Sequence, residues 1–261
     1  MSVPAFPKIS IITVCKNSGR FLEETIRSVI AQTYPNIEYV IIDGGSTDNT
    51  LEIIHKFEDY IAYWKSEDDS GMYDAINKGL WHITGDYILI LNSDDMLYAP
   101  DTLEKVAIHV RKDKLDYYFG NLIKLKDGKL KQVKLFNVNF RQLLLSTHGT
   151  FAPHPCFFIS AALNKKLGGY DATYRYAADY DYILRALKDD KSSGSYMDIN
   201  VSKFRIHENS ITASGRIETE RIKILSKYKY YQQSFLSRKF FYYKLWIYYK
   251  IINLGNKYRV I

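Results

Sequence analysis

The sequence predicts an α/β protein in which a mostly parallel β-sheet carries helices on both of its faces. The first observation is a set of short apolar runs at Ile9–Val14, Ile37–Ile42 and Tyr87–Leu91, each of the length of a buried strand. The second is that stretches with helical spacing of apolar residues separate these runs, with short loops between them. A connecting helix returns the chain to the same end of the sheet, so strands that alternate with helices pair in parallel. The length of 261 residues allows one large α/β domain and an appendage.

The helices of the first half are predicted from their periodicity and from their ends. Apolar residues recur at i, i+3 and i+4 through Leu22–Ile30, and again along one face of Met72–Ile83. Between these two helices, Asn49 can cap a third, with Glu52 three residues later in the pattern of a capping box. A short strand is expected at Tyr63–Ser66. The first half therefore contains three strand–helix units before the strand that begins at residue 87.

The second half of the chain is predicted to be more antiparallel. Pro100 is a good first residue of a helix, and Asp101–Lys112 follows it with helical character. Asp127-Gly128 lies between two strand-like runs and predicts a hairpin with a type I′ turn. The other expected elements are helices at 140–145, at 161–167 and from Tyr176 onward, and strands at 116–125, 129–135 and 196–206.

Polar side chains lie at or just beyond the carboxyl ends of the predicted parallel strands. They are Thr13, Cys15, Asn17, Asp43, Asp69 and Asp94. Ligands collect where the carboxyl ends of parallel strands meet, so we expect these side chains to form one site. No glycine-rich phosphate fingerprint follows any of these strands. A phosphate bound here would therefore be neutralised by a metal ion rather than by a cradle of glycine N–H groups.

The segment Asn92-Ser93-Asp94-Asp95, which ends a buried strand, indicates such a metal. Neighbouring carboxylates repel each other, and taking them out of water is costly unless a cation joins them. Mg²⁺ and Mn²⁺ take oxygen ligands of this kind, with phosphate oxygens in the remaining positions. The alternative is a solvated loop that caps the following helix.

The composition is that of an ordinary folded protein, with 46% hydrophobic and 25% charged residues. The two cysteines, Cys15 and Cys156, provide neither a disulfide framework nor metal-ligand spacing, as in proteins of a reducing cytosol. The N-terminal residues lack the pattern of a signal peptide, and no run reaches the roughly 18 uncharged apolar residues of a membrane span. We therefore expect a cytoplasmic protein.

The positive charge is concentrated in a C-terminal tail, residues 216–261. This tail has eleven Lys and Arg and two acids, a balance of +9, so that residues 1–215 carry −2 of the total of +7. It also has helical spacing of apolar residues, and 12 of the chain's 39 aromatic residues. A basic, aromatic helix is typical of binding to an anionic membrane surface. The alternatives are a helix packed on the body of the protein or a contact in a homodimer. Two units are expected, a body over 1–215 and a helical tail over 216–261.

Six segments occur in the order in which one enzyme family has them. They are Ile11–Val14 with Asn17, Asp43–Asp48, Gly71–Gly79, Gly85–Asp95, Ala178–Asp181 and Arg205–His207. With these segments the chain resembles the inverting glycosyltransferases of family 2, over roughly residues 8–212. The resemblance implies the GT-A fold, which is Rossmann-like. Two positions differ from the family pattern: Asn92 stands where an Asp is usual, and Ile76 stands where some relatives have an Arg.

The resemblance also implies roles for individual residues. Five of them would lie around a nucleoside, usually uridine, with Asp43 accepting from the base: Thr13, Cys15, Asn17, Asp43 and Asp69. Asp94 and Asp95 would form an acidic motif that contacts the metal and the ribose, and Asn92 leaves open which of the two holds the metal. His207 is expected to contact the metal or the diphosphate, and Arg205 to contact a phosphate.

Asp179 resembles the catalytic base of the family. Asp179 and Asp181 are two positions apart, so on a helix their side chains point about 200° away from each other, and only one can face a cleft. We expect Asp179 to be that residue. The alternative is that Asp179 serves only as the N-cap of its helix.

These features predict a metal-dependent inverting glycosyltransferase that uses Mn²⁺ or Mg²⁺. It would move a hexose or N-acetylhexosamine from a nucleotide-diphospho sugar, expected to be UDP-linked, to an acceptor hydroxyl. The expected acceptor is a saccharide or polyprenyl-linked saccharide in bacterial surface-polysaccharide or lipid-linked oligosaccharide synthesis, with the enzyme on the inner face of the cell membrane. One alternative is an inactive nucleotide-sugar-binding protein. The other is a nucleic-acid-binding protein that acts through the basic tail, although no nucleic-acid-binding motif is present.

Overall fold

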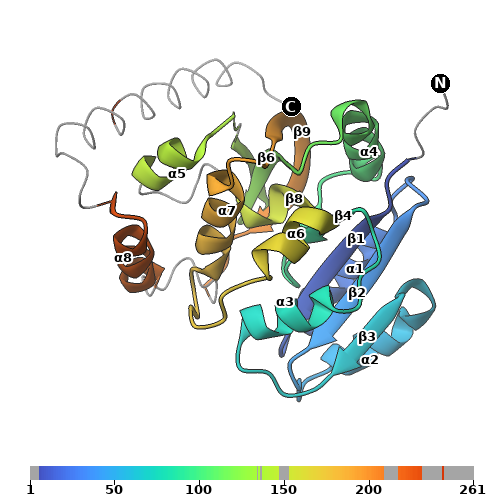
Figure 1. The fold of residues 1–261 in the computed structure, drawn as a ribbon. Coiled ribbons are helices and arrows are strands. Elements are labelled where there is room, and N and C mark those ends of the chain that lie inside the picture. Colours follow the sequence, from blue (N-terminus) through green and yellow to red (C-terminus); the bar gives the residue numbers. More distant parts are fainter. Residues whose placement is uncertain are drawn as a thin grey trace.

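The computed structural model describes residues 6–133, 135, 137–146, 153–208, 217–230 and 243. In this part of the chain, nine strands form one sheet in the order β3-β2-β1-β4-β8-β6-β9-β5, and β7 pairs with β6 beside this path. Figure 1 shows helices in front of this sheet and behind it. The arrangement is the α/β architecture that the sequence predicts.

The first half of the chain forms the parallel part of the sheet. Its strands are β1 (Ile9–Cys15), β2 (Ile37–Asp43), β3 (Tyr63–Ser66) and β4 (Tyr87–Ile90). β1 pairs in parallel with both β2 and β4, and β2 pairs in parallel with β3. The helices between them are α1 (Leu22–Ile30), α2 (Thr50–Lys56), the short 3₁₀ helix η1 (Glu58–Tyr60) and α3 (Met72–Leu80).

The second half adds the mixed part of the sheet. Its strands are β5 (Met96–Leu97), β6 (Tyr117–Lys126), β7 (Lys129–Val133), β8 (Phe157–Ser160) and β9 (Gly194–Arg205). β8 lies antiparallel between β4 and β6, and the β6–β7 hairpin and the β5–β9 pair are antiparallel too. β9 pairs in parallel with β6, so this half is less antiparallel than the sequence suggested.

The helices of the second half are α4 (Thr102–Asp113), α5 (Phe140–Ser146), the 3₁₀ helix η3 (His154–Cys156), α6 (Ala161–Leu167), α7 (Ala178–Lys188) and α8 (Ile217–Lys227). α7 begins at Ala178 rather than at Tyr176, where the sequence placed its start.

Two hydrophobic cores lie on opposite faces of the sheet. Ile12 and Ile42 contribute to one core, together with α3, α5, α6, α7 and α8. Ile11 and Ile41, their neighbours in the strands, contribute to the other core with α1, α2 and α4. Successive side chains of a strand point to opposite faces, so a strand with a continuous apolar run supplies both cores at once. The prediction of helices on both faces is confirmed.

Two predictions about turns have different outcomes. Asp127 and Gly128 both have positive φ, 49° and 71°, as the type I′ turn predicted for this hairpin requires. The capping box at Asn49 was wrong, because Asn49 makes no side-chain cap bond. Instead Oδ1 of Asp48 accepts the backbone N–H of Thr50 over 3.0 Å. Asp48, rather than Asn49, thus provides the side-chain hydrogen bond at the start of α2.

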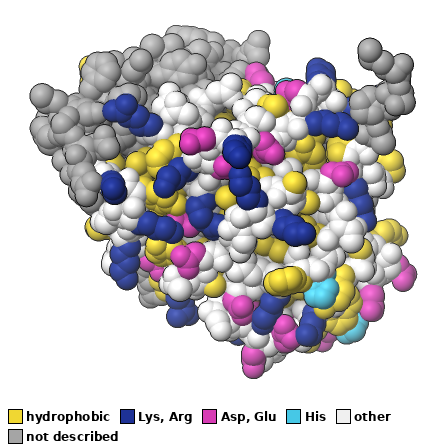
Figure 2. All heavy atoms as spheres, in the orientation of Figure 1, with side chains coloured by type: hydrophobic (Ala, Val, Ile, Leu, Met, Phe, Trp, Pro, Cys, Tyr) yellow, Lys and Arg dark blue, Asp and Glu magenta, His cyan; other side chains and the backbone are white. Residues whose placement is uncertain are grey.

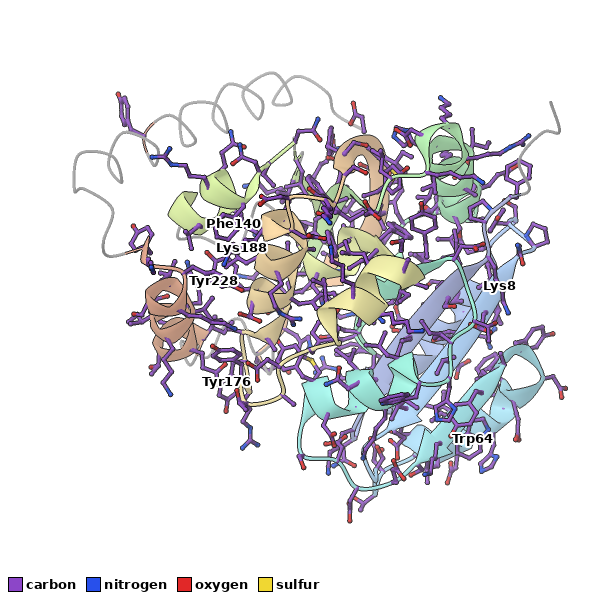
Figure 3. The ribbon with its side chains drawn as sticks, in the orientation of Figure 1. Lys8, Trp64, Phe140, Tyr176, Lys188 and Tyr228 are labelled. Carbon is purple, nitrogen blue, oxygen red and sulfur yellow. The ribbon has the colours of Figure 1, made fainter. Side chains whose placement is uncertain are left out.

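α8, the part of the expected tail that the structure describes as a helix, packs on the body. Ile224 and Leu225 are buried in the same core as α7. Beyond the helix, Figure 3 shows Phe140 and Lys188 beside Tyr228, with ring centroids of Phe140 and Tyr228 5.5 Å apart. We expect membrane or dimer contacts for the whole tail, 216–261, of which residues 216, 231–242 and 244–261 lie outside the described residues. Among the described residues, no helix has the length and apolarity needed to cross a membrane.

Candidate active site

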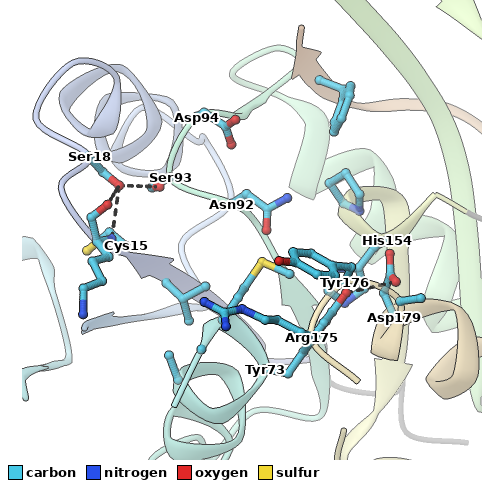
Figure 4. A pocket seen from close by; sticks show the side chains of 18 of the residues that line it. Cys15, Ser18, Tyr73, Asn92, Ser93, Asp94, His154, Arg175, Tyr176 and Asp179 are labelled. Atoms are coloured by element: carbon cyan, nitrogen blue, oxygen red, sulfur yellow. Dashed lines mark hydrogen bonds between the residues drawn. The ribbon is translucent and has the colours of Figure 1, made fainter. Parts of the chain in front are cut away.

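A cavity of about 890 Å³ opens at the carboxyl edge of the parallel strands. The loops after β1, β3 and β4 line one side of it, and η3, the start of α7 and α8 line the other. Figure 4 shows Cys15 and Asp94 facing Asp179 and Tyr176 across this cavity. The sequence argument placed a site at this edge, and the structure provides a cavity there.

Asp94 and His207 meet on the wall of the cavity. Oδ2 of Asp94 lies 3.0 Å from Nε2 of His207, although the two residues are 113 positions apart. Nearby in the chain, Oδ1 of Asn92 is buried without a hydrogen-bond partner in the described protein. An unsatisfied buried oxygen of this kind commonly marks the place of a water or an ion.

A divalent metal fits this part of the cavity. A carboxylate, an imidazole and an amide oxygen are ligand types that Mn²⁺ accepts, and Mn²⁺ or Mg²⁺ commonly takes further ligands from phosphate and water. The described residues contain no cluster of three or more His, Cys, Asp or Glu that would hold a metal alone. Asp94 and His207 would therefore bind the metal jointly with a substrate rather than as a complete protein site.

Asp95, the other predicted metal ligand, has different surroundings. Its side chain is fully buried and is not part of the cavity wall. Oδ1 accepts the backbone N–H of Arg205 over 3.0 Å, and Oδ2 accepts Nδ2 of Asn92 over 3.2 Å. Burial, and after it the charge of Asp94, raises the pKa of Asp95 well above its usual range. These bonds join the loop after β4 to the end of β9, and so they place His207 beside Asp94.

Arg205, predicted to contact a phosphate, is engaged with protein groups. Its Nη2 donates to Oε2 of Glu24 over 2.7 Å, and its Nε donates to the backbone carbonyl of Asp94 over 3.1 Å. Its guanidinium also lies 4.4 Å from the ring centroid of Phe21. It is not among the residues that line the cavity. Its contacts support the loop that carries Asp94.

Three of the five residues predicted to surround a nucleoside line the cavity, namely Cys15, Asn17 and Asp69. Burial, followed by the charge of Asp43, raises the pKa of the Cys15 thiol, which therefore stays neutral. Asn17 has φ of 50° and accepts the N–H of Thr47 over 2.8 Å, which fixes the loop after β1.

The other two, Thr13 and Asp43, are fully buried and do not line the cavity. Oδ2 of Asp43 accepts the backbone N–H groups of Gly45 and Ser46 over 3.1 and 2.9 Å. It also accepts the hydroxyl of Ser66 over 2.6 Å. In this structure Asp43 thus orders the turn after β2.

The structure places Asp179 and Asp181 in different environments. Asp179 lines the cavity, and its Oδ1 accepts the hydroxyl of Tyr73 over 3.1 Å. Asp181 is fully buried and accepts Nε of Arg185 and Nζ of Lys227, both over 2.8 Å. Of the two carboxylates, Asp179 is therefore the one available to a substrate.

Several cavity residues were not identified from the sequence. They are Lys16, Arg20, Lys124, Arg175, Tyr176 and Arg221. Arg175 and Tyr176 directly precede the segment that contains Asp179, so proximity to that segment could have indicated them. Nothing in the local sequence indicated Arg221, which comes from α8.

His154 is a buried histidine of η3. It lies on the cavity wall between two prolines, and its Nε2 is 2.6 Å from the hydroxyl of Tyr170. Burial lowers the pKa of His154, while the nearby charge of Asp179 opposes that shift. The hydrogen bond to Tyr170 fixes the orientation of the ring.

The family model of glycosyl transferase family 2 matches residues 10–168 of this chain. The chain belongs to that family. This family 2 glycosyltransferase is 35% identical over 182 residues to an uncharacterized glycosyltransferase of Mycobacterium tuberculosis, covering 69% of each protein. It is 30% identical over 204 residues to a PGL/p-HBAD biosynthesis glycosyltransferase of Mycobacterium bovis, covering 77% of each.

Solved structures confirm the GT-A fold of this glycosyltransferase. The structure of TarS 1–349 from S. aureus in complex with UDP-GlcNAc superposes with a TM-score of 0.69 at 20% identity. The match covers 84% of this chain and 65% of that one, so this chain spans about two thirds of the TarS segment. The mannosyltransferase PcManGT from Pyrobaculum calidifontis, in complex with GDP-Man and Mn²⁺, gives a TM-score of 0.62 at 17% identity, covering 87% and 65%.

Proposed function

We propose that this glycosyltransferase transfers a sugar with inversion from a UDP-linked donor to an acceptor hydroxyl, with Asp179 as the general base. The observation that carries the proposal is that Asp179 and the Asp94–His207 pair line the same cavity from opposite sides. An inverting transfer requires this arrangement, because the acceptor attacks from the side of the sugar ring that faces away from the leaving diphosphate.

The hydrogen bonds of Asp179 suit the role of a general base. The hydrogen bond from Tyr73 occupies one side of its Oδ1 and orients the carboxylate. Oδ2 has no partner in the described protein, so it is available to accept the proton of an acceptor hydroxyl. Proton acceptance at Oδ2 would increase the nucleophilicity of the attacking oxygen as the bond to the sugar forms.

The opposite side of the cavity offers a place for the donor. Cys15, Asn17 and Asp69 form the wall on which we place the nucleoside. Lys16 and Arg20 line the same region and supply positive charge toward a diphosphate. A divalent cation held by Asp94 and His207 would neutralise the charge that develops on the leaving diphosphate. Of the two acids predicted for the metal, we choose Asp94.

The class of acceptor is proposed from the relatives. The Mycobacterium bovis relative is named for PGL/p-HBAD biosynthesis, and TarS was solved with UDP-GlcNAc. We infer that this enzyme acts in the synthesis of a surface polysaccharide or a lipid-linked saccharide, at the inner face of the membrane. Contact with that membrane would be made by the tail, residues 216–261, whose basic and aromatic composition favours an anionic surface.

Two alternatives to this function remain testable. An inactive nucleotide-sugar binder would bind UDP-sugars without turnover. A nucleic-acid-binding protein would act through the basic tail, 216–261, much of which lies outside the described residues, and Figure 2 shows Lys and Arg interspersed with Asp and Glu over the visible face of the described part.

The decisive experiment measures release of UDP from a panel of UDP-sugars with Mn²⁺, with water or an added saccharide as acceptor. We expect turnover in the wild type and its loss in Asp179→Asn, with binding of UDP retained. Asp190→Asn is the matched control, since Asp190 is an exposed acid just after the same helix. Binding of UDP-sugars without turnover in any protein would instead identify the inactive binder.

A further inference from the structure

Glu220, in the first turn of α8, binds three consecutive backbone N–H groups of another segment. Its Oε1 accepts the N–H of Arg175 over 2.7 Å. Its Oε2 accepts the N–H of Tyr176 over 2.7 Å and that of Ala177 over 3.0 Å. One carboxylate therefore fixes the whole stretch that leads into α7.

These N–H groups lie at the positive end of α7. The first N–H groups of a helix have no partner within the helix and are usually capped by a side chain at the N-cap position. Ala177 occupies that position in α7 and provides no side-chain cap. Glu220 accepts the N–H of this N-cap residue and those of the two residues before it, while the N–H of Tyr180 inside the first turn goes to Oδ1 of Asp179. The negative charge of Glu220 near this end of α7 also matches the helix dipole.

Residues 175–177, which Glu220 binds, lie at the acceptor side of the candidate active site. Arg175 and Tyr176 line the cavity, and Asp179 follows Ala177 by two residues. We propose that Glu220 is a positioning residue for the transfer reaction, and that α8 is thereby part of the catalytic unit although it lies beyond the residues matched by the family model. This inference rests on the proposed role of Asp179.

The C-terminal end of α8 is joined to α7 independently of Glu220. Asp181, in the first turn of α7, accepts Nζ of Lys227 over 2.8 Å and the hydroxyl of Tyr228 over 3.2 Å. Ile224 is buried in the core that α7 shares. Loss of Glu220 should therefore leave α8 docked while freeing residues 175–177. The two ends of α8 can be tested separately.

The test compares Glu220→Gln with Lys227→Met. Glutamine keeps the size of the side chain, but it has one acceptor oxygen and turns an NH₂ group toward the backbone donors. We expect Glu220→Gln to lower kcat for Mn²⁺-dependent release of UDP from UDP-GlcNAc by about 10- to 100-fold, with KM for the donor changed less than about twofold. Lys227→Met removes a contact at the other end of α8, so it should lower Tm about as much as Glu220→Gln does and leave kcat within about twofold of wild type.

Hydrogen exchange measures the ordering itself, whether or not a suitable acceptor is in hand. The amides of residues 175–177, which Glu220 binds, should exchange faster in Glu220→Gln and at the wild-type rate in Lys227→Met. Unchanged exchange in Glu220→Gln would overturn the inference. Equal losses of kcat in the two variants would also overturn it, because the effect would then follow stability alone. If Asp179→Asn stays active, the proposed function is what fails. If Asp179→Asn is inactive while Glu220→Gln turns over normally, only the role of Glu220 fails.

Discussion

The hydroxyl of Tyr73 donates a hydrogen bond to Oδ1 of Asp179 over 3.1 Å, between residues 106 positions apart. Tyr73 lies in α3, on the parallel half of the sheet, and Asp179 lies in the first turn of α7. Burial, and after it the charge of Asp179, raises the pKa of Tyr73, so the phenol remains a neutral donor. The orientation of Asp179, the proposed base, thus depends on a side chain of α3.

Tyr73→Phe should lower kcat about tenfold. A hydrogen bond from a neutral hydroxyl to a charged carboxylate contributes about 1.5 kcal/mol, which here would be lost from the placement of Asp179. KM for the donor should stay near the wild-type value. Steady-state kinetics with UDP-sugars checks both constants. Tyr87→Phe is the control, since the hydroxyl of Tyr87 donates to the carbonyl of Leu115 over 2.7 Å, away from the cavity. A wild-type kcat in Tyr73→Phe would contradict the orienting role.

Asp94→Asn should abolish the response to Mn²⁺, whereas Asp95→Asn should lower the stability of the ligand-free protein. In Asp94→Asn, the additional Tm increase that Mn²⁺ gives to the UDP complex should disappear, because a metal ligand is lost. In Asp95→Asn that increase should remain, but the ligand-free Tm should fall. Both oxygens of Asp95 accept N–H donors, so the amide introduced by Asp95→Asn would turn its NH₂ group toward one of those donors. This mismatch should cost about 1–3 kcal/mol of stability, and Tm should fall by about 2–4 °C for each kcal/mol.

Thermal-shift curves of each variant with UDP, with Mn²⁺ and with both separate these effects. Loss of the Mn²⁺ response in Asp95→Asn, with retention in Asp94→Asn, would reverse our assignment of the metal ligand.

Glu38 should make folding sensitive to acid. Burial alone would raise its pKa, but hydrogen bonds from Lys8, Ser10 and Thr84 lower it from 4.5 to about 2. A carboxyl with a lowered folded-state pKa adds stability above its unfolded pKa, and the contribution is lost as the pH falls through the folded pKa. The unfolding free energy of the wild type relative to Glu38→Gln should therefore fall by about 3 kcal/mol between pH 4.5 and about pH 2. Urea denaturation across this range measures the difference, and a constant difference would refute the prediction.

Arg221→Met should raise the Tm of the ligand-free protein by about 2 °C. Nε and Nη2 of Arg221 are buried without hydrogen-bond partners in the described protein. The guanidinium lies 5.7 Å from the ring centroid of Tyr180, near the outer limit of a cation–π contact, so we expect its desolvation cost to outweigh that contact. Its Nη1 donates to Glu218 over 3.0 Å, but the side chain of Glu218 is 64% exposed, and such pairs contribute little. Glu218→Gln, which keeps the guanidinium, should change Tm by less than about 1 °C. A lower Tm in Arg221→Met would show that the guanidinium stabilises the fold.

The sequence predicted much of the fold because its signals are local. The buried strands carry continuous apolar runs, and the helices between them have clear periodicity. A cavity lies at the edge where the sequence predicts a site, since the topology of a parallel sheet determines where the strand ends meet. The capping box was placed at Asn49, whereas the side-chain bond comes from Asp48, because neighbouring Asp and Asn are nearly equivalent as caps.

The finer features of the site depend on contacts between distant residues, which no local pattern encodes. Asp94 and Asp95 are neighbours, but only Asp95 is fully buried, where it accepts the N–H of Arg205, 110 positions away. Likewise Glu220 is an ordinary acid in the first turn of a helix until α8 packs beside α7. Such distinctions arise only from tertiary packing.

β2 carries a buried carboxylate near each of its ends, Glu38 at the start and Asp43 at the finish. Glu38 joins the starts of neighbouring segments through Ser10 and Thr84, while Asp43 shapes a turn beside the cavity. One end of β2 therefore contributes to the stability of the fold, and the other end lies beside the substrate cavity. A protein engineer could strengthen the contacts of Glu38 to gain tolerance for heat or acid, and could separately vary the residues at the cavity end to accept new donors and acceptors.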